Sequence, residues 1–158
     1  MTYPIRGRRH APRGTHDPAA AAGYADLVAG AMRQELRITL PWPPSVNRYW
    51  RHVGVRVLLS ENGRKYRQHV ADLVMVARCS GRFSADQRLM VDITACPPDR
   101  RRRDLDNIPK ALLDALEAAG VMPDDEQIDS MTIVRGTVLK GGRAYVWMRE
   151  IQEERNDG

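Results

Sequence analysis

The sequence predicts a single α/β (α+β) domain in which a mixed β-sheet packs against two main helices. Three observations support this fold class. The chain has 158 residues, which is enough for one domain with its own core. Strand-like and helix-like segments follow one another in the order β-β-β-α-β-α-β-β, and no segment repeats another.

The first half of this pattern begins with a predicted strand at residues 36–40. Three prolines in the next segment, Pro41–Arg51, predict an extended loop without a helix. RYWRH and VRVLL predict two short strands on either side of Gly54. Ser60 is a good N-cap, so we expect a helix from Glu61 to about Arg78. The predicted apolar face of this helix contains Tyr66, Val70, Leu73, Val74 and Ala77.

The outer stripe of this predicted helix carries Arg64, Arg67 and Arg78. A solvated helix face is the simpler interpretation of such a stripe. A DNA-facing surface is the alternative, and under it Arg64 and Arg67 are candidate DNA-binding residues.

The second half of the pattern begins with a predicted strand at residues 88–95. A helix is then expected from Asn107 to Ala119, with Gly120 as its stop. A turn-rich loop and two strands, at residues 128–138 and 143–151, complete the domain. The core-facing positions of the second helix are predicted to be Leu105, Ile108, Leu112, Leu116 and Ala119.

The predicted domain covers residues 34–152. Residues 1–33 are basic and then rich in alanine, without a strand pattern, so we expect a mobile N-terminal tail. Residues 153–158 are expected to form a C-terminal tail. The alanine-rich part loosely imitates a signal peptide, but Asp17 and Asp26 interrupt it, so secretion is not expected.

Charge and cysteine usage indicate the partner and the compartment. The net charge of +5 favours a polyanionic partner such as nucleic acid. Arginine greatly outnumbers lysine, which suits phosphate contact, although a codon bias toward arginine is an alternative cause. No segment is apolar enough to span a membrane. Cys79 and Cys96 form no metal-binding or secreted-type pattern, so a cytoplasmic location is expected.

The segment RRRRDLDNIPK, residues 100–110, places four arginines directly before two aspartates. Pro109 is tolerated only in the first turn of a helix, so Asp104 and Asp106 lie at the positive helix end. If the preceding segment is extended, both carboxylates point to the same side. Lys110, four residues after Asp106, lies on the same helical face. The structural alternative is that Asp106 caps the helix and Asp104 pairs with an arginine.

A second acidic cluster follows the helix and contains Asp124, Asp125, Glu126 and Asp129. Taken alone, a Pro-Asp-Asp turn is an ordinary surface turn. Two acidic clusters that flank one helix beside an arginine run are harder to explain structurally. Hard oxygen ligands of this kind suit Mg²⁺, which prefers a few carboxylates together with water and substrate phosphate.

The combination of LPWPPSVNRYWR, RRRRDLDNIPKALLDALEAAGV and DDEQID resembles the RusA family of Holliday junction resolvases from bacteria and phages. The resemblance implies a RusA-like fold and a homodimeric endonuclease that nicks four-way DNA junctions symmetrically. It implies Mg²⁺ as the cofactor, with Mn²⁺ as a substitute. It also identifies metal-binding and catalytic carboxylates at Asp104, Asp106 and Asp125, and a catalytic lysine at Lys110.

The resemblance extends to the residues around these positions. Asp124 is the adjacent, assisting acid, and Arg103 matches a functional arginine of the family. Candidate DNA-binding residues in the loop are Arg100, Arg101, Arg102 and Arg103.

Three functions follow from these patterns. The first is a magnesium-dependent, structure-selective endonuclease that resolves Holliday junctions in DNA recombination and repair. The second is a metal nuclease that acts on other branched DNA, such as flaps or forks. The third is a non-catalytic DNA-binding module in which the aspartates are structural.

Overall fold

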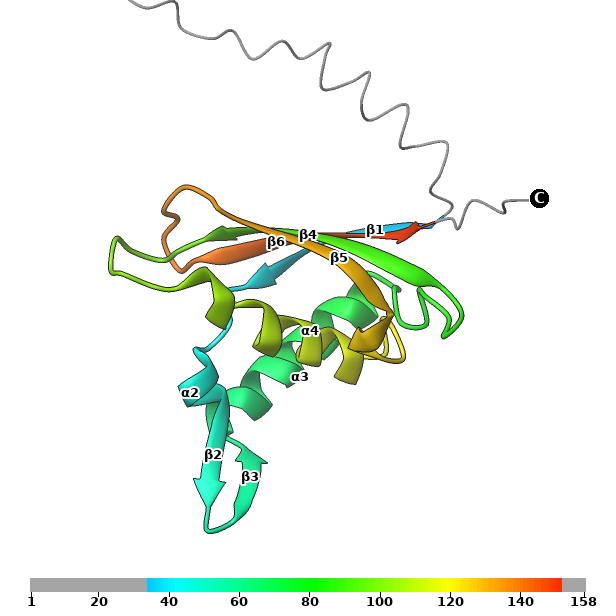
Figure 1. Ribbon diagram of the computed structural model, residues 1–158. Helices are drawn as coiled ribbons and strands as arrows, with labels where there is room; N and C mark the ends of the chain where they lie inside the picture. The colour runs from blue at the N-terminus through cyan, green and yellow to red at the C-terminus, as the bar shows by residue number, and fades with distance from the viewer. Residues whose placement is uncertain (1–33, 152–158) are drawn as a thin grey trace, which may run out of the picture. The chain divides into compact units, whose positions relative to one another are not determined.

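A four-stranded mixed sheet is the framework of the computed structural model, which describes residues 34–151. The strand order is β1-β6-β4-β5. Strand β6 pairs antiparallel with β1 and β4, whereas β4 and β5 are parallel (Figure 1). The mixed sheet and the α/β (α+β) class are therefore confirmed. The strands are β1 (Glu35–Pro41), β4 (Arg88–Cys96), β5 (Ile128–Arg135) and β6 (Arg143–Ile151). The predicted tails at residues 1–33 and 153–158 lie outside the described residues.

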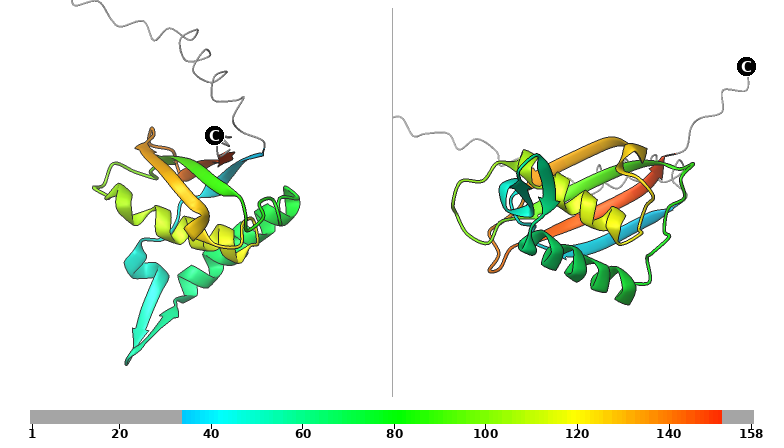
Figure 2. Two further views of the ribbon diagram at one scale, coloured as in Figure 1. Left: turned by 45° about the vertical axis from the view of Figure 1, so that its right-hand side comes forward. Right: turned by 90° about the horizontal axis from the view of Figure 1, so that it is seen from below.

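Two helices, α3 (Glu61–Val76) and α4 (Pro109–Ala118), cover one face of this sheet (Figure 2). Strand β4 shows why that face needs a cover, because its residues alternate between buried and partly exposed positions. Its buried side chains pack with the apolar stripes of both helices into one core. The core includes Leu89, Val91, Ile93, Val70, Val74, Leu112 and Leu116.

The boundaries of the two helices agree closely with the sequence. Helix α3 begins after Ser60, whose hydroxyl accepts a hydrogen bond from the Gly63 backbone N–H at 2.9 Å. Helix α4 begins at Pro109, which needs no N–H partner there, and Gly120 follows it with φ +77°. Ala77 is the exception among the predicted core positions of the first helix, because it lies beyond the end of α3 and is exposed.

The segment after β1 differs from the prediction, because an extended loop without helix is wrong for its last residues. The structure has a short helix there, α2 (Val46–Tyr49). All three prolines precede this helix, so none removes a hydrogen bond from it. The two predicted strands follow as β2 (Trp50–Val53) and β3 (Arg56–Leu59).

Strands β2 and β3 pair only with each other and form a hairpin outside the four-stranded sheet. Figure 1 shows the hairpin extending away from the sheet, beyond the ends of α3 and α2. The backbone N–H of Ser60 donates to the Tyr49 carbonyl at 2.9 Å, which joins the two ends of the hairpin. The hairpin is therefore anchored at its base.

Both cysteines of the chain are buried and free. Cys79 follows α3, and its thiol donates to the Val74 carbonyl at 3.7 Å. Cys96 ends β4. Burial raises the pKa of the Cys79 thiol. Within residues 34–151, every helix is too short or too polar to cross a lipid bilayer.

The close contact between α3 and the hairpin base predicts an unusual response to Gly63→Ala. Glycine to alanine in a helix normally stabilises by about 1 kcal/mol. Here the added Cβ would lie 2.5 Å from the Tyr49 carbonyl oxygen and 2.7 Å from Leu59 Cδ1. We expect a net loss of about 1–3 kcal/mol in the free energy of unfolding, measured by urea denaturation. His69→Ala, at an exposed position of the same helix, is the control and should change stability little.

Candidate active site

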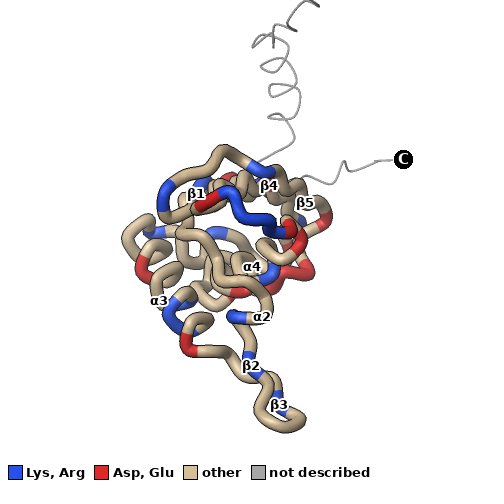
Figure 3. Tube along the Cα trace, turned by 90° about the vertical axis from the view of Figure 1, so that its left-hand side faces the viewer, with Lys and Arg blue, Asp and Glu red and all other residues tan. Residues whose placement is uncertain are grey.

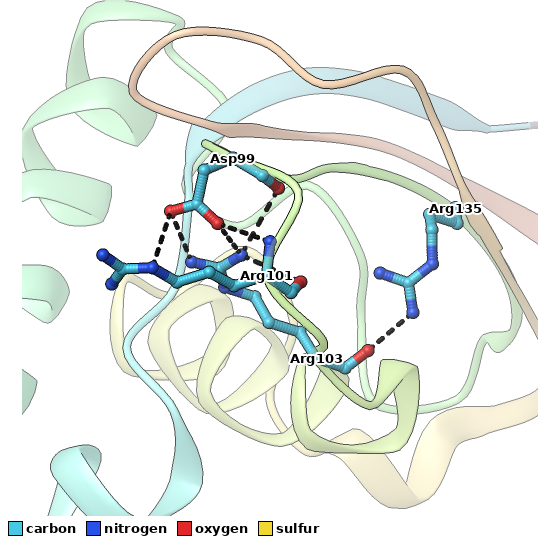
Figure 4. Close-up of polar contacts among 4 residues, drawn as sticks. All are labelled: Asp99, Arg101, Arg103 and Arg135. Carbon is cyan, nitrogen blue, oxygen red and sulfur yellow. Dashed lines mark hydrogen bonds and ion pairs between the residues drawn. The ribbon is translucent and has the colours of Figure 1, made fainter.

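The arginine run lies in the loop between β4 and α4, and the carboxylate of Asp99 organises it (Figure 4). The Arg103 guanidinium donates to both oxygens of Asp99, at 2.6 and 2.9 Å. The Arg101 backbone N–H donates to the same carboxylate at 2.9 Å. These donors, with Arg103 first, lower the pKa of the Asp99 carboxyl to about 2. The loop therefore contains its own counter-ion.

This pairing separates Arg103 from the other arginines of the loop. Its side chain is 24% exposed, and its guanidinium lies 5.9 Å from the ring centre of Trp42. Its carbonyl oxygen accepts a hydrogen bond from Arg135 at 2.6 Å (Figure 4). Arg100, Arg101 and Arg102 are exposed. Arg103 thus holds the loop in place. Arg100 and Arg102 present their charge to solvent, and the Arg101 guanidinium lies 4.0 Å from the Asp99 carboxylate.

A pocket lies between this loop and the segment around α2. Arg48 lines it from one side, and Arg101, Arg102 and Asp104 line it from the other. Figure 3 shows basic positions on this loop, on α2 and on the hairpin. Arg48 was not identified from the sequence, because only the fold brings α2 next to the loop.

Asp104 and Asp106 flank the start of a short 3-10 helix, η1 (Leu105–Asn107), that leads into α4. The expected extended segment is present at Asp104, with φ −83° and ψ 134°, but not at the next three residues. Both aspartates are exposed. Among residues 34–151, neither carboxylate caps a helix or forms an ion pair with an arginine. The structure therefore does not show the contacts that the structural alternative requires.

Helix α4 carries a polar stripe from this turn toward its C-terminal end. Lys110, Asp114 and Glu117 are spaced by four and three residues, so they lie along one side of the helix. Lys110 is exposed and lines a pocket with Trp50, His52 and Val57 of the hairpin. The ten residues of α4 extend about 15 Å.

A cluster of three carboxylates lies at the other end of α4. Oxygens of Glu117, Asp124 and Asp125 lie within 4.8 Å of one another. Burial, and then the charges of Asp125, Asp124 and Asp114, raise the pKa of the Glu117 carboxyl. Carboxylates held this close repel one another, which is the arrangement that a cation would stabilise.

Gln127 holds the Asp-Asp turn of this cluster against the domain. It is 4% exposed and belongs to a second 3-10 helix, η2 (Asp125–Gln127). Its side-chain amide donates to the carbonyls of Ser84 and Gln87, at 2.6 and 2.9 Å. Its amide oxygen accepts from the Asp124 backbone N–H at 3.2 Å. The turn that the sequence identified is thus rigidly placed.

The structure brings some of the predicted site residues together and separates others. Asp124 and Asp125 share a cluster with Glu117, which the sequence analysis missed. Asp104 and Asp106 belong to no group of three such ligands among the described residues. The only signal for Glu117 was its spacing from Lys110 along one helix face.

Arg64 and Arg67, the candidate DNA-binding residues of α3, have different surroundings. Arg64 is exposed and donates to the Leu59 carbonyl at 2.9 Å. Arg67 forms an ion pair with Asp114 at 2.6 Å, and it also donates to the Tyr49 hydroxyl at 2.9 Å. The Tyr49 hydroxyl donates to the same Asp114 carboxylate. The charge of Arg67 is therefore compensated inside the domain, whereas Arg64 is exposed on the surface.

Known proteins of one family are similar to this chain in sequence. The sequence model of the family described as "Endodeoxyribonuclease RusA" matches residues 41–149. A protein of Enterobacteria phage HK97 named crossover junction endodeoxyribonuclease rusA is 41% identical over 118 residues, covering 75% of this chain and 97% of the relative. The protein of that name from Escherichia coli K12 is 42% identical over 117 residues, covering 74% and 96% of the two chains. The relative from Enterobacteria phage 82 is 41% identical with the same coverage.

The Asp99–Arg103 pair predicts a specific titration behaviour. Because the pKa of Asp99 is lowered, the pair stabilises the folded loop above about pH 4 and is lost as the pH falls toward 2. In Arg103→Gln we expect the titration midpoint of the Asp99 carboxyl, followed by ¹³C NMR, to rise toward 3.8. Arg102→Gln is the matched control and should leave the midpoint unchanged. Equal midpoints in all three proteins would contradict the pairing.

Proposed function

Because this chain belongs to the RusA family of endodeoxyribonucleases, we propose that it resolves four-way DNA junctions by paired symmetric nicks that depend on a divalent metal ion. One observation carries the proposal. Asp104 and Asp106 are exposed carboxylates that form no ion pair within residues 34–151, and in the sequence they lie between the arginine loop and Lys110. Phosphodiester hydrolysis needs groups of these three kinds within one region.

The donor set fits a hard divalent cation. Asp104, Asp106 and Asp125 offer exposed carboxylate oxygens, and the pKa of Glu117 is raised beside Asp125 and Asp124. Mg²⁺ prefers a few carboxylates and keeps several water ligands, and Mn²⁺ is an acceptable substitute for such oxygen donors. We propose that Asp104 and Asp106 hold the divalent metal at the start of α4, and that Asp125, with Asp124 assisting, holds it at the other end of the helix beside Glu117. When bound, the ion lowers the pKa of a coordinated water and polarises the scissile phosphate.

The chain's own residues supply the remaining interactions with the DNA backbone. Lys110 is exposed at the first turn of α4, where its ammonium group can stabilise the charge that develops on the cleaved phosphate. Arg100, Arg101 and Arg102 bind neighbouring phosphates. Arg103 acts as a positioning residue, because its guanidinium is held by Asp99. Arg48 extends the phosphate-binding surface across the pocket.

The proposal also covers assembly and location. Resolution requires two nicks in symmetry-related strands, and each chain offers one set of site residues, so the active form is a homodimer with C2 symmetry. Its role is in DNA recombination and repair. The free, buried thiols of Cys79 and Cys96 suit a reducing compartment, so the proposal places the protein in the cytoplasm.

The carboxylate substitutions test the catalytic part of the proposal. Asp104→Asn, Asp106→Asn and Asp125→Asn should each lower the rate of Mg²⁺-dependent junction cleavage by about 100-fold or more, because each loses several kcal/mol of charge stabilisation. Junction binding in EDTA should persist, since the arginines are unchanged. Asp72→Asn, at an exposed acid on α3, is the control. Full activity in all three site variants would refute the metal site.

The substrate is tested by comparing a synthetic four-way junction with forks, flaps and linear duplex under the same conditions. Preferential cutting of the junction supports resolution, whereas preferential cutting of forks or flaps indicates a different branched substrate. Binding without cutting of any of them would indicate a non-catalytic DNA-binding module.

Assembly is tested by analytical ultracentrifugation at micromolar protein concentration, with and without junction DNA. We expect a dimer, and we expect its affinity for DNA to fall steeply with salt because several arginines contact phosphates. A protein that stayed monomeric on the junction, yet cut both strands together, would contradict the assembly.

A further inference from the structure

We propose that the β2–β3 hairpin is a wedge that enters the branch point of the DNA, with Val55 at its tip, and so provides selectivity for junctions over linear duplex. The inference rests on the proposed function, because it assigns the hairpin to the same branched substrate. It is carried by the exposure, the charge and the position of the hairpin.

The hairpin exposes apolar side chains that the fold does not need. Val53, Val57 and Leu58 are 51%, 55% and 39% exposed, and Val55 is fully exposed at the tip next to Gly54. An isolated two-stranded hairpin is at best marginally stable, and its exposed apolar side chains contribute no burial free energy to the stability of the free protein. Such a projection is typical of an element that becomes buried in a partner.

Charge decides which partner is favoured. Residues 36–60 contain no aspartate or glutamate and include Arg37, Arg48, Arg51 and Arg56. The register places Arg51 and Arg56 with Val53 and Leu58 on one face of the hairpin. In a symmetric contact between two hairpins, these arginines would meet without acids to compensate them. A nucleic acid avoids this repulsion, because its phosphates pair with the arginines that flank the apolar tip.

The other face of the hairpin points to the candidate active site. Trp50, His52 and Val57 of this face line one pocket together with Lys110. DNA held by the hairpin would therefore lie beside the lysine that we place in the reaction. The strands have four residues each, so the hairpin extends roughly 13 Å, enough to cross a major groove about 8.5 Å deep.

The base of the hairpin is anchored to the domain by a buried side chain and by hydrogen bonds. Tyr49, immediately before β2, is fully buried, and its hydroxyl is held by Asp114 and Arg67. At the other end, Ser60 links the Tyr49 carbonyl to the first turn of α3. The wedge is thus connected to α4, the helix that carries Lys110.

Selectivity follows from the energetics of base stacking. An apolar wedge in continuous duplex must separate stacked base pairs, which costs a few kcal/mol per step. Base pairs at a branch point lack a continuous stacking neighbour, so the wedge enters there at lower cost. The hairpin would therefore bind a junction tightly and a linear duplex weakly.

The test uses four-way junctions with 2-aminopurine at the branch point, whose fluorescence rises when the base is unstacked. Wild type, Val55→Ser and the control Val76→Ser are compared in EDTA. Val76 is 78% exposed on α3, so the control replaces another exposed valine that lies outside the hairpin. Melting temperature, affinity for linear duplex and sedimentation are measured for each protein.

We expect wild type and Val76→Ser to raise the fluorescence, and Val55→Ser to lose most of the rise. The junction affinity of Val55→Ser should fall about tenfold, the value of one buried valine side chain, with unchanged duplex affinity and melting temperature. An unchanged fluorescence rise in Val55→Ser would overturn the wedge. A shift of Val55→Ser toward smaller species in sedimentation would also overturn it, because the hairpin would then be a subunit contact.

The wedge and the proposed function can fail separately. A protein that unstacks the branch point through Val55 but cuts nothing with Mg²⁺ retains the wedge and loses the proposed endonuclease activity. A protein that cuts junctions equally well with and without the Val55 side chain retains the activity and loses the wedge.

Discussion

The arrangement of the site depends on the hydrogen bonds that the carboxylate of Asp114 accepts. It accepts hydrogen bonds from Tyr49 at the end of α2 and from Arg67 on α3, while it belongs to α4 itself. Three helices are thereby joined at one atom group. Because Lys110 and Glu117 lie one turn to either side of Asp114, the same contact fixes the rotation of α4 and the direction of both side chains. Burial and the hydrogen bond to Asp114 raise the pKa of Tyr49, so the hydroxyl keeps its proton and remains a donor.

The second organising principle is that the basic loop contains an acid. Four consecutive arginines repel one another, and a loop of this kind would ordinarily be spread by its own charge. Asp99 compensates two of them, through the Arg103 side chain and the Arg101 backbone and guanidinium. The loop is therefore shaped before DNA arrives. A preformed surface loses less conformational freedom on binding than a mobile one, so more of the phosphate attraction is retained as affinity.

Much of the fold could be predicted from local signals. Ser60, Pro109 and Gly120 mark helix ends for reasons that lie within a few residues, and β4 shows its buried face by simple alternation. Contacts between distant segments could not be predicted in this way. The helical stripe that contains Arg67 is predicted to face solvent, because its partner Asp114 belongs to α4, which is distant in the sequence. Glu117 joins an acidic cluster only because η2 brings Asp124 and Asp125 back beside α4. Similarly, the sequences of β2 and β3 predict strands. The alternation of apolar residues does not predict which strand each one pairs with, or whether it joins the main sheet.

The burial of both native thiols has a practical consequence for optical and magnetic measurements on this molecule. Cys79 and Cys96 are each 4% exposed, and burial disfavours the reactive thiolate of Cys79. Maleimide reagents would therefore modify a single cysteine introduced on the surface and leave the native pair unlabelled. One fluorophore or spin label per chain, without removal of any natural residue, would then report distances between protein and nucleic acid.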